Sequence, residues 1–543
     1  RKIFNEPSRV STSIKHPPMK RRDFLKNTVP VGVVMPALVG GFSFKAFGAE
    51  DPIAQSLLLP AAVENDHVLV IIQLNGGNDG LNTVIPLENF SNYVNVRSNI
   101  YIPEDKVLKL SGVTKAGLHP AMTGLQAMYN DGELSIIQSV GYPQPNFSHF
   151  RATDIWMSAS DSNMVVNSGW AGRFLDAEFP NFPNGYPNAS MTDPLAIQIG
   201  SATSLTFQGP AVSMGMSISN TSSFYNLING VRDTAPNTPA GKELNFVRMV
   251  AQQTQQYASI IKDAAAKVPT QVTYPTGNSL ADQLKIVARL IKGGLKTRVY
   301  MVNFGGFDTH ASQVNATDTT TGSHATLLGR VSDAIRAFQK DLKFLGVDDR
   351  VAGMTFSEFG RRVKSNGSVG TDHGAAAPLF VFGKNVIPGV LGATPKFGAN
   401  ATVGENVPFE FDFRSVYATL LSNWLCVSDT DLQQIMLKNF QTLPLVNAAA
   451  CKKAVNLSGE DLVHNYPNPF TSKTVISFKT AGGHTLIQVM DMLGRVITNL
   501  TDRDYAPGTY TVVFDSGSLP SGVYYARLQN MSVQQVHTML KVK

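Results

Sequence analysis

The chain has 543 residues, of which 43% are hydrophobic and 16% are charged. Because domains average about 150 residues, this length predicts two to four folded units. The composition is that of a globular protein and excludes an intrinsically disordered chain. The net charge of +6 arises in residues 1–49, where nine basic side chains accompany two acidic ones. The remainder is close to neutral, so the main argument for nucleic-acid binding disappears.

Residues 19–49 have the pattern of an export signal, which makes residues 1–18 an upstream extension before Met19. The run RRDFLK, beginning at Arg21, leads into an apolar stretch that prolines and glycines interrupt. The stretch is too broken for the roughly 20 apolar residues of a membrane-spanning helix. It resembles a twin-arginine signal, which implies the twin-arginine translocase as a partner and passage through the periplasm; the alternative is an ordinary core helix. We expect no integral membrane segment in the mature protein.

Residues 61–452 alternate between strand-like and helix-like segments, which predicts a doubly wound, mostly parallel α/β sheet. Short apolar runs predict buried strands at His67–Leu74, Leu134–Val140, Arg298–Phe304, Val351–Phe356 and Pro378–Gly383. Apolar residues at helical spacing predict helices near 120–129, 243–268, 279–291, 327–342 and 414–425. Ser279 with Asp282 resembles a capping box that opens the third of these helices. Residues 180–240 lack periodicity, and we expect an irregular lid or insertion over the sheet there.

Polar side chains follow four of these strands. They are Asp79 after the first, Ser148, His149 and Arg151 after the second, Asp308 and His310 after the third, and Glu358, Arg361, Arg362, Asp372 and His373 after the fourth. Because the carboxyl ends of parallel strands meet at one edge of a sheet, these side chains should converge. Mixed carboxylates and imidazoles suit zinc, manganese or iron, and carboxylate-rich sets suit magnesium or calcium.

Several of these residues admit more than one role. Ser148 and His149 have the chemistry of a nucleophile or a ligand, and Arg151 and Arg361 that of a clamp on an anion. The alternatives are that Ser148 caps the following helix, that Asp79 is a solvated turn residue, and that the last loop is solvated. The repetition of the pattern after successive strands favours a site.

The blocks NGGNDGLNTVIP, HPAM, GYPQPNFSHFRATDIW, GFDTHASQ, SEFGRRV and GTDHGAAAPLFVFG resemble the secreted family known as domain of unknown function 1501. That family is similar to the alkaline phosphatase and sulfatase superfamily. The resemblance implies an alkaline phosphatase-like fold and a metal-dependent hydrolase. It also implies a ligand set of Asp79, Asp308, His310, Glu358 and His373, with Asp372 beside the last, and it places Ser148 at the position of the nucleophile.

The sequence departs from the superfamily in two respects. Neither Cys426 nor Cys451 lies in the C-x-P-x-R context from which sulfatases make formylglycine, so an ordinary sulfatase of that type is not expected. Ser-Glu-Phe-Gly replaces Ser-Asp-His-Gly, which removes an imidazole ligand and leaves open a site with one metal or none. In an exported protein the two cysteines would form a disulfide; two buried thiols are the alternative.

The character of the sequence changes near a linker at residues 453–462. Alternating runs in residues 463–543 predict a small antiparallel, immunoglobulin-like β-sandwich. The motifs YPNPF, DMLGRV and LPSGVYYARL resemble the C-terminal sorting domain of the Bacteroidetes type IX secretion system. This resemblance implies the type IX machinery as a partner and a secreted or cell-surface destination.

The sequence is compatible with two functions. The first is an exported metal-dependent hydrolase of phosphate or sulfate esters, acting on a small-molecule or polymer substrate. The second is a non-catalytic cell-surface protein that binds a glycan or a cell-wall polymer on a degenerate alkaline phosphatase-like fold.

Overall fold

A computed structural model describes residues 65–219, 257–447, 463–480, 483–492, 494–505, 508–530 and 534–542. The chain divides into a unit of residues 63–461 and a second unit that contains residues 462–543. The predicted twin-arginine segment, the linker and Cys451 lie outside the described residues, so the export signal and the disulfide stay predictions.

The larger unit is built on a nine-stranded sheet in the order β13-β5-β12-β9-β1-β8-β6-β7, with β14 paired to β5. The strands are β1 (Val68–Asn75), β5 (Leu134–Gly141), β6 (Ala196–Ile199), β7 (Gly215–Ile218), β8 (Val299–Gly305), β9 (Val351–Phe356), β12 (Ala377–Phe382), β13 (Gly389–Leu391) and β14 (Phe411–Asp412). Of these described strands, β12 alone runs antiparallel to its neighbours, β5 and β9. The prediction of a mostly parallel sheet is therefore confirmed.

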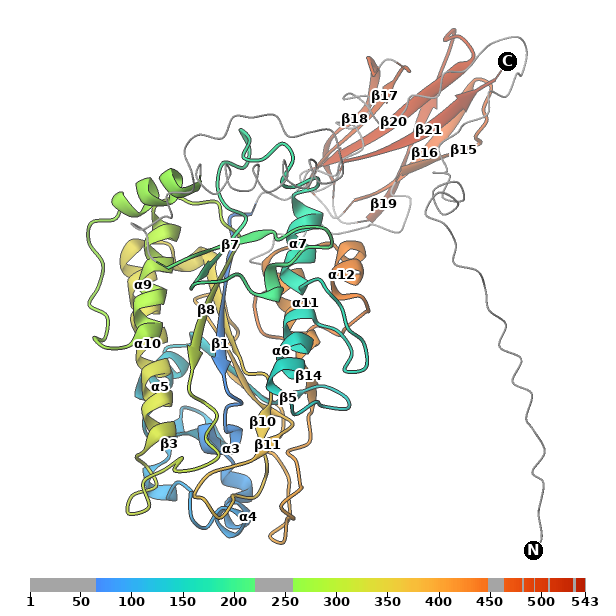
Figure 1. The fold of residues 1–543 in the computed structure, drawn as a ribbon. Coiled ribbons are helices and arrows are strands. Elements are labelled where there is room, and N and C mark those ends of the chain that lie inside the picture. Colours follow the sequence, from blue (N-terminus) through green and yellow to red (C-terminus); the bar gives the residue numbers. More distant parts are fainter. Residues whose placement is uncertain are drawn as a thin grey trace, which may run out of the picture. The chain divides into compact units, whose positions relative to one another are not determined.

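Helices cover both faces of this sheet (Figure 1). One face carries α5 (Thr123–Asn130), α9 (Ser279–Lys292) and α10 (Ser323–Leu345), and the other carries α6 (His149–Ser158), α7 (Trp170–Glu178), α11 (Phe413–Thr419) and α12 (Asp429–Met436). The helix α11 continues into a π-helical turn at Leu420–Trp424. Gly346, which has a left-handed backbone conformation, ends α10.

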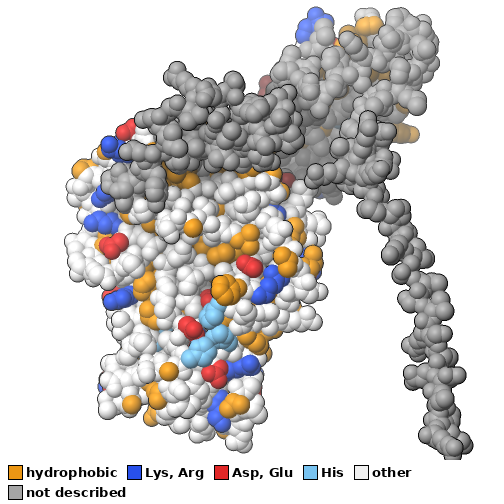
Figure 2. Space-filling model, in the orientation of Figure 1, with side chains coloured by type: hydrophobic (Ala, Val, Ile, Leu, Met, Phe, Trp, Pro, Cys, Tyr) orange, Lys and Arg blue, Asp and Glu red, His pale blue; other side chains and the backbone are white. Residues whose placement is uncertain are grey.

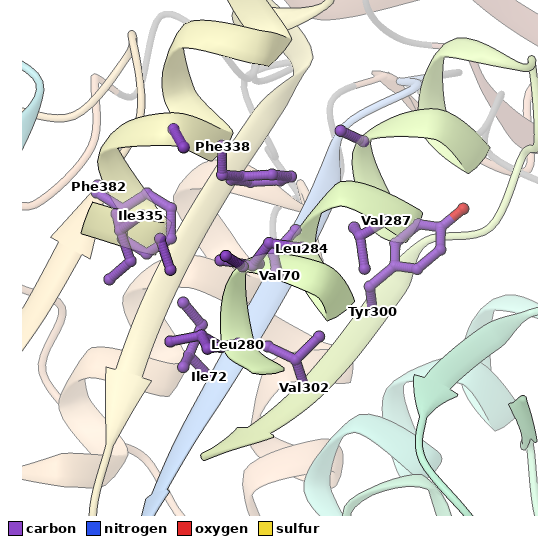
Figure 3. Close-up of a cluster of buried hydrophobic side chains, with 14 of the residues drawn as sticks. Val70, Ile72, Leu280, Leu284, Val287, Tyr300, Val302, Ile335, Phe338 and Phe382 are labelled. Carbon is purple, nitrogen blue, oxygen red and sulfur yellow. The ribbon is translucent and has the colours of Figure 1, made fainter. Parts of the chain in front are cut away.

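Strand β1 is buried on both faces, which explains why its sequence is apolar without alternation. Val70 and Ile72 pack toward α9 and α10, in a core that includes Phe338 (Figure 3). Leu69 and Ile71 belong to a second core on the opposite face. Because burial of one such side chain is worth about 1.5–3 kcal/mol, the two cores hold the carboxyl edge of the sheet firmly in place.

Shorter elements surround that edge. They are α3 (Gly80–Thr83), α4 (Phe90–Val96), a small sheet of β2 (Val84–Ile85), β4 (Val113–Leu118) and β3 (Leu108–Leu110), and the antiparallel pair β10 (Gly360–Arg361) and β11 (His373–Gly374). The pair β10 and β11 sets Arg361 opposite His373. The strand-end segments thus acquire a fixed register of their own.

Two expectations about local structure were wrong. Residues 180–240, expected to be an irregular lid or insertion, contain β6 and β7 within their described part, and these strands extend the sheet itself. The helix α9 begins at Ser279 itself, and its cap is the preceding residue, Asn278, whose side chain accepts a hydrogen bond from the Ala281 amide. Asn278 thus takes the capping role that we expected of Ser279.

The C-terminal unit consists of two antiparallel sheets, β15-β16-β19 and β18-β17-β20-β21. Their strands are β15 (Val463–Tyr466), β16 (Lys473–Thr480), β17 (Gly483–Met490), β18 (Val496–Tyr505), β19 (Gly508–Asp515), β20 (Gly522–Asn530) and β21 (Gln534–Lys541). The all-β prediction is confirmed, whereas the immunoglobulin-like topology stays a prediction. Within the described part of the chain, no helix combines the length and apolarity that membrane crossing requires.

Candidate metal centre

Three side chains with metal-ligand chemistry meet at the carboxyl edge of the sheet. His149 begins α6 after β5, Asp308 follows β8, and His373 lies in β11. One ligand atom from each lies within 4.8 Å of the other two. Figure 2 shows the histidines gathered on one face of the larger unit, with acidic and basic side chains beside them. The predicted convergence of strand ends therefore brings these three residues together.

Both histidines of this cluster direct Nε2 toward Asp308. The Nδ1 atom of His149 lies 2.8 Å from a Glu358 carboxylate oxygen, and its Nε2 lies 3.6 Å from Asp308. The Nδ1 atom of His373 lies 2.8 Å from the Phe147 carbonyl, and its Nε2 lies 3.5 Å from Asp308. An acceptor at Nδ1 fixes the proton there and leaves the Nε2 lone pair for a metal.

The ring of Phe359 packs against both imidazoles. Its centroid lies 4.9 Å from that of His149 and 4.4 Å from that of His373. This residue occupies the place where the superfamily resemblance expected a histidine ligand. An apolar ring at this position limits rotation of the two imidazoles and contributes no ligand.

Asp308 is held as an anion by its neighbours. Arg361 donates to its Oδ1 at 2.8 Å, and His310 Nδ1 lies 2.6 Å from the same oxygen. Burial raises the pKa of Asp308, but the hydrogen bond and charge of Arg361, with the neighbouring histidines, hold that pKa at about 2. Burial lowers the pKa of His373, and the charge of Arg361 adds to this effect. Near neutral pH these two groups therefore have the protonation states that a cation requires.

Arg361 connects the loops that follow the strand ends. Its side chain is buried and donates to the carbonyls of Gly76, Gly77, Phe307 and Thr371. Its donors are therefore occupied by this chain, so the clamp on a substrate anion that the sequence suggested is replaced by a contact to Asp308. Arg362, the next residue, stacks its guanidinium on the Phe147 ring at 4.9 Å.

Glu358 lies behind His149 and is 2% exposed. Besides His149, it accepts a hydrogen bond of 2.8 Å from the Gly76 amide. Gly76 has a φ of +124°, and a Cβ there would lie 2.3 Å from the Asp308 backbone nitrogen. Glycine is required at this turn because the β1 and β8 loops approach so closely.

Asp79 lies in a separate buried network. Its side chain is 0% exposed and forms an ion pair with Arg97 at 2.6 Å. The side-chain amide of Gln313 also donates to it at 2.6 Å. Burial raises the pKa of Asp79, but the charge and hydrogen bond of Arg97 outweigh this effect, so the pKa lies below its ordinary value. The carboxylate is therefore an anion, and Arg97 is its counter-charge.

The remaining predicted site residues lie around the cluster. Ser148 is exposed at the N-cap of α6, and its hydroxyl makes no hydrogen bond within the part of the chain that the structure describes. Arg151 donates to the carbonyls of Asp161, Ser162 and Met164 and so fastens the loop after α6. Asp372 is exposed and accepts a hydrogen bond from Asn366. His310 contacts Asp308, and its ring stands 4.5 Å from that of His373.

The donor set fits a divalent metal ion. His373 Nε2 is a buried nitrogen that lacks a hydrogen-bond partner among the described residues, although it faces a carboxylate. Two imidazoles and one carboxylate suit zinc, manganese or iron, and three protein ligands leave positions open for a substrate. A bound ion would supply the missing partner of His373.

Sequence reasoning missed three residues that organise this region: Arg97, Gln313 and Phe359. Gln313 closes the GFDTHASQ block and Phe359 lies within SEFG, so both were present in motifs that the sequence singled out. Arg97 had no such signal, because it follows α4 in a stretch without a motif.

The fold and the cluster define an α/β protein with a candidate metal centre at the edge of its sheet. Residues 66–425 match the family of proteins of unknown function DUF1501, and because the match covers most of the chain, the protein belongs to this family. Residues 464–542 match the secretion system C-terminal sorting domain, which confirms the predicted type IX sorting domain and indicates a secreted or cell-surface protein.

A search of curated proteins finds no match to this chain. Among solved structures, the surface component PorZ of the Porphyromonas gingivalis type IX secretion system is 19% identical over 17% of this chain and 13% of its own, with a TM-score of 0.13. The PsFucS1 sulfatase of Pseudoalteromonas sp. is 10% identical over 83% of this chain and 84% of its own, with a TM-score of 0.30. A Silicibacter pomeroyi phosphonate monoester hydrolase is 9% identical over 87% and 88%, with a TM-score of 0.29. Similarities this low leave the substrate open.

Proposed function

We propose that this protein is a secreted, metal-dependent hydrolase of phosphate or sulfate esters, with a divalent ion held by His149, Asp308 and His373. The observation that carries the proposal is the set of three ligand atoms within 4.8 Å of one another. Zinc or manganese fits this donor set better than magnesium or calcium, because two of the three ligands are imidazoles. When bound, the ion supplies Lewis-acid stabilisation of the negative charge that develops on the ester.

The neighbouring residues have supporting roles in this proposal. Glu358 keeps the proton of His149 on Nδ1, and the Phe147 carbonyl does the same for His373. Arg361 orients the Asp308 carboxylate. Of the ligands implied by the family resemblance, Asp308 and His373 keep that role, whereas Glu358 supports a ligand and Asp79 balances Arg97.

The alcohol portion of the ester is proposed to lie against Phe150. This residue directly follows His149 and is 87% exposed, so its aromatic ring is open to contact with a ligand. A sugar or aryl ring would pack on its face while the charged ester group occupies the metal centre. Arg151 strengthens this arrangement, because it ties the first turn of α6 to the loop at residues 161–164.

Elemental analysis of the freshly purified chain tests the proposal. We expect about one equivalent of zinc or manganese, lost in His149→Ala and His373→Ala and retained in His464→Ala, a matched change at an exposed histidine of the C-terminal unit. The parent should hydrolyse p-nitrophenyl phosphate or p-nitrophenyl sulfate, and a chelator should abolish this. A metal content well below one equivalent in the parent would overturn the proposal.

One observation favours a second candidate, a non-catalytic protein that binds a surface polymer. The Ser148 hydroxyl has no hydrogen bond to a base within the described residues, and Arg151 is occupied by backbone carbonyls. Binding of a glycan or cell-wall polymer that is lost in the double variant His310→Ala, His373→Ala, together with no esterase activity in the metal-loaded parent, would favour this candidate.

A further inference from the structure

We infer that Gln313 is the positioning residue that fixes the two ligand-bearing loops of the metal centre, those of Asp308 and His373, to the buried Asp79. The inference rests on the proposed metal site and assigns to this glutamine a role that its sequence motif does not disclose. Gln313 is 0% exposed and is not one of the three clustered ligands.

The side-chain amide of Gln313 makes three hydrogen bonds to three different strand-end segments. Its Nε2 donates to Asp79 after β1 at 2.6 Å. Its Oε1 accepts from the hydroxyl of Thr309 after β8 at 3.0 Å and from that of Thr371 before β11 at 2.8 Å. The carboxylate of Asp79 offers only acceptors, so the amide orientation is determined by its partners.

These partners are neighbours of the ligands in the chain. Thr309 directly follows Asp308, and Thr371 precedes His373 by two residues. The amide of Thr371 also donates to the carbonyl of Thr309 at 3.2 Å, while the carbonyl of Thr371 accepts from Arg361, the residue that holds Asp308. A shift of either threonine therefore moves a ligand.

The chemistry of the amide is specific to this position. A carboxylate at 313 would accept from both threonines but would oppose the charge of Asp79. An apolar side chain of similar size would leave the two hydroxyls and one carboxylate oxygen without this partner. Among side chains of this size, glutamine alone carries on one planar group an N–H that donates to Asp79 and an oxygen that accepts from both threonines.

The variant Gln313→Met tests the inference in the full chain, with Gln339→Met as the matched control. Gln339 is also a buried glutamine, in α10, but its amide lacks a hydrogen-bond partner among the described residues. Titration of the metal-stripped protein with zinc, against a competing chelator, should give affinity about 10- to 100-fold weaker for Gln313→Met and unchanged for Gln339→Met. Equal zinc affinity of the parent and a folded Gln313→Met variant would overturn the inference.

Two further measurements separate this inference from the proposed function and from simple misfolding. Hydrogen exchange at the amides of Thr309 and Thr371 should accelerate in Gln313→Met, whether or not the parent binds zinc. A parent that fails to bind zinc would refute the proposed function, whereas unchanged exchange at both amides would refute the role of Gln313. If Gln313→Met does not fold, Thr371→Val removes one of the three hydrogen bonds of Gln313. Unchanged zinc affinity and unchanged hydrogen exchange in Thr371→Val would also overturn the inference.

Discussion

The Nδ1 atom of His149 lies 2.8 Å from Oε1 of Glu358, and Glu358 is buried behind the imidazole. This pairing turns Nε2 of the histidine toward Asp308. A carboxylate behind a ligating histidine fixes the ring orientation and makes the imidazole a stronger ligand. The two residues lie 209 positions apart in the chain, and the sheet brings them together.

We expect Glu358→Gln to weaken zinc binding about 10- to 100-fold, because the amide holds the His149 proton less strongly than the carboxylate does. The measurement is a zinc titration of the metal-stripped chain. Glu410→Gln is the matched control, since Glu410 also accepts a backbone hydrogen bond, from Ala393, outside the metal cluster. Equal losses in the two variants would show that the effect is not specific to His149.

Asp79→Asn should destabilise the larger unit by about 3–5 kcal/mol, because it leaves the buried guanidinium of Arg97 without its anion. The folded fraction should keep its metal, since Asp79 is not among the three clustered ligands and the amide oxygen of asparagine still accepts the hydrogen bond from Gln313 Nε2. Urea unfolding and elemental analysis together check this. In the control Asp372→Asn, at an exposed residue, both stability and metal content should stay within error, and metal loss there would restore Asp372 as a ligand.

The fold was largely predictable because its central strands are continuous apolar runs, as β1 and β9 show. Parallel strands place their carboxyl ends at one edge, so the neighbourhood of the site followed from topology alone. The strands β6 and β7 escaped prediction because each has four residues within a polar, proline-rich stretch. Length and local composition carry little information on such short strands.

The direction of each polar side chain was less predictable than its location. Asp79 and Asp308 both follow glycine-rich turns, yet one meets Arg97 in the interior and the other faces two histidines. That difference depends on Arg97 after α4 and on histidines from α6 and β11, which local sequence does not reveal. His149 is a ligand candidate because Glu358 lies within hydrogen-bond distance of its Nδ1 atom and leaves Nε2 for a metal. This contact joins segments that are distant in the sequence, so local sequence does not predict it.

Phe150→Ala should raise KM for an aryl phosphate or sulfate about 2- to 10-fold and leave kcat and metal content unchanged, because it removes only packing against the alcohol portion. Stability should stay within about 0.5 kcal/mol, since the side chain is 87% exposed. Phe344→Ala is the matched control, because Phe344 is 60% exposed on α10, away from the cluster. An unchanged KM in Phe150→Ala would remove Phe150 from the substrate site.

The stability of the metal-free larger unit should fall as the pH is lowered from about 6.5 to about 4. Burial lowers the pKa of His324 from 6.5 to about 4, in an environment where its Nδ1 has no partner among the described residues. In this window the unfolded chain takes up a proton that the folded chain refuses, so the free energy of unfolding decreases with acidity and is at its full value above pH 6.5. One pKa unit corresponds to about 1.4 kcal/mol.

Urea unfolding followed by tryptophan fluorescence measures this effect in the larger unit alone, because Trp156, Trp170 and Trp424 all belong to it. His324→Gln keeps a donor toward Asn78, which His324 Nε2 contacts at 3.0 Å, but it does not titrate. The pH slope between 4 and 6.5 should therefore become shallower in His324→Gln and stay as in the parent in His464→Gln. A buried neutral imidazole must take up a proton on unfolding in this pH range, and this uptake is the source of the expected slope. Equal slopes in the parent and both variants would therefore show that His324 does not cause the acid sensitivity.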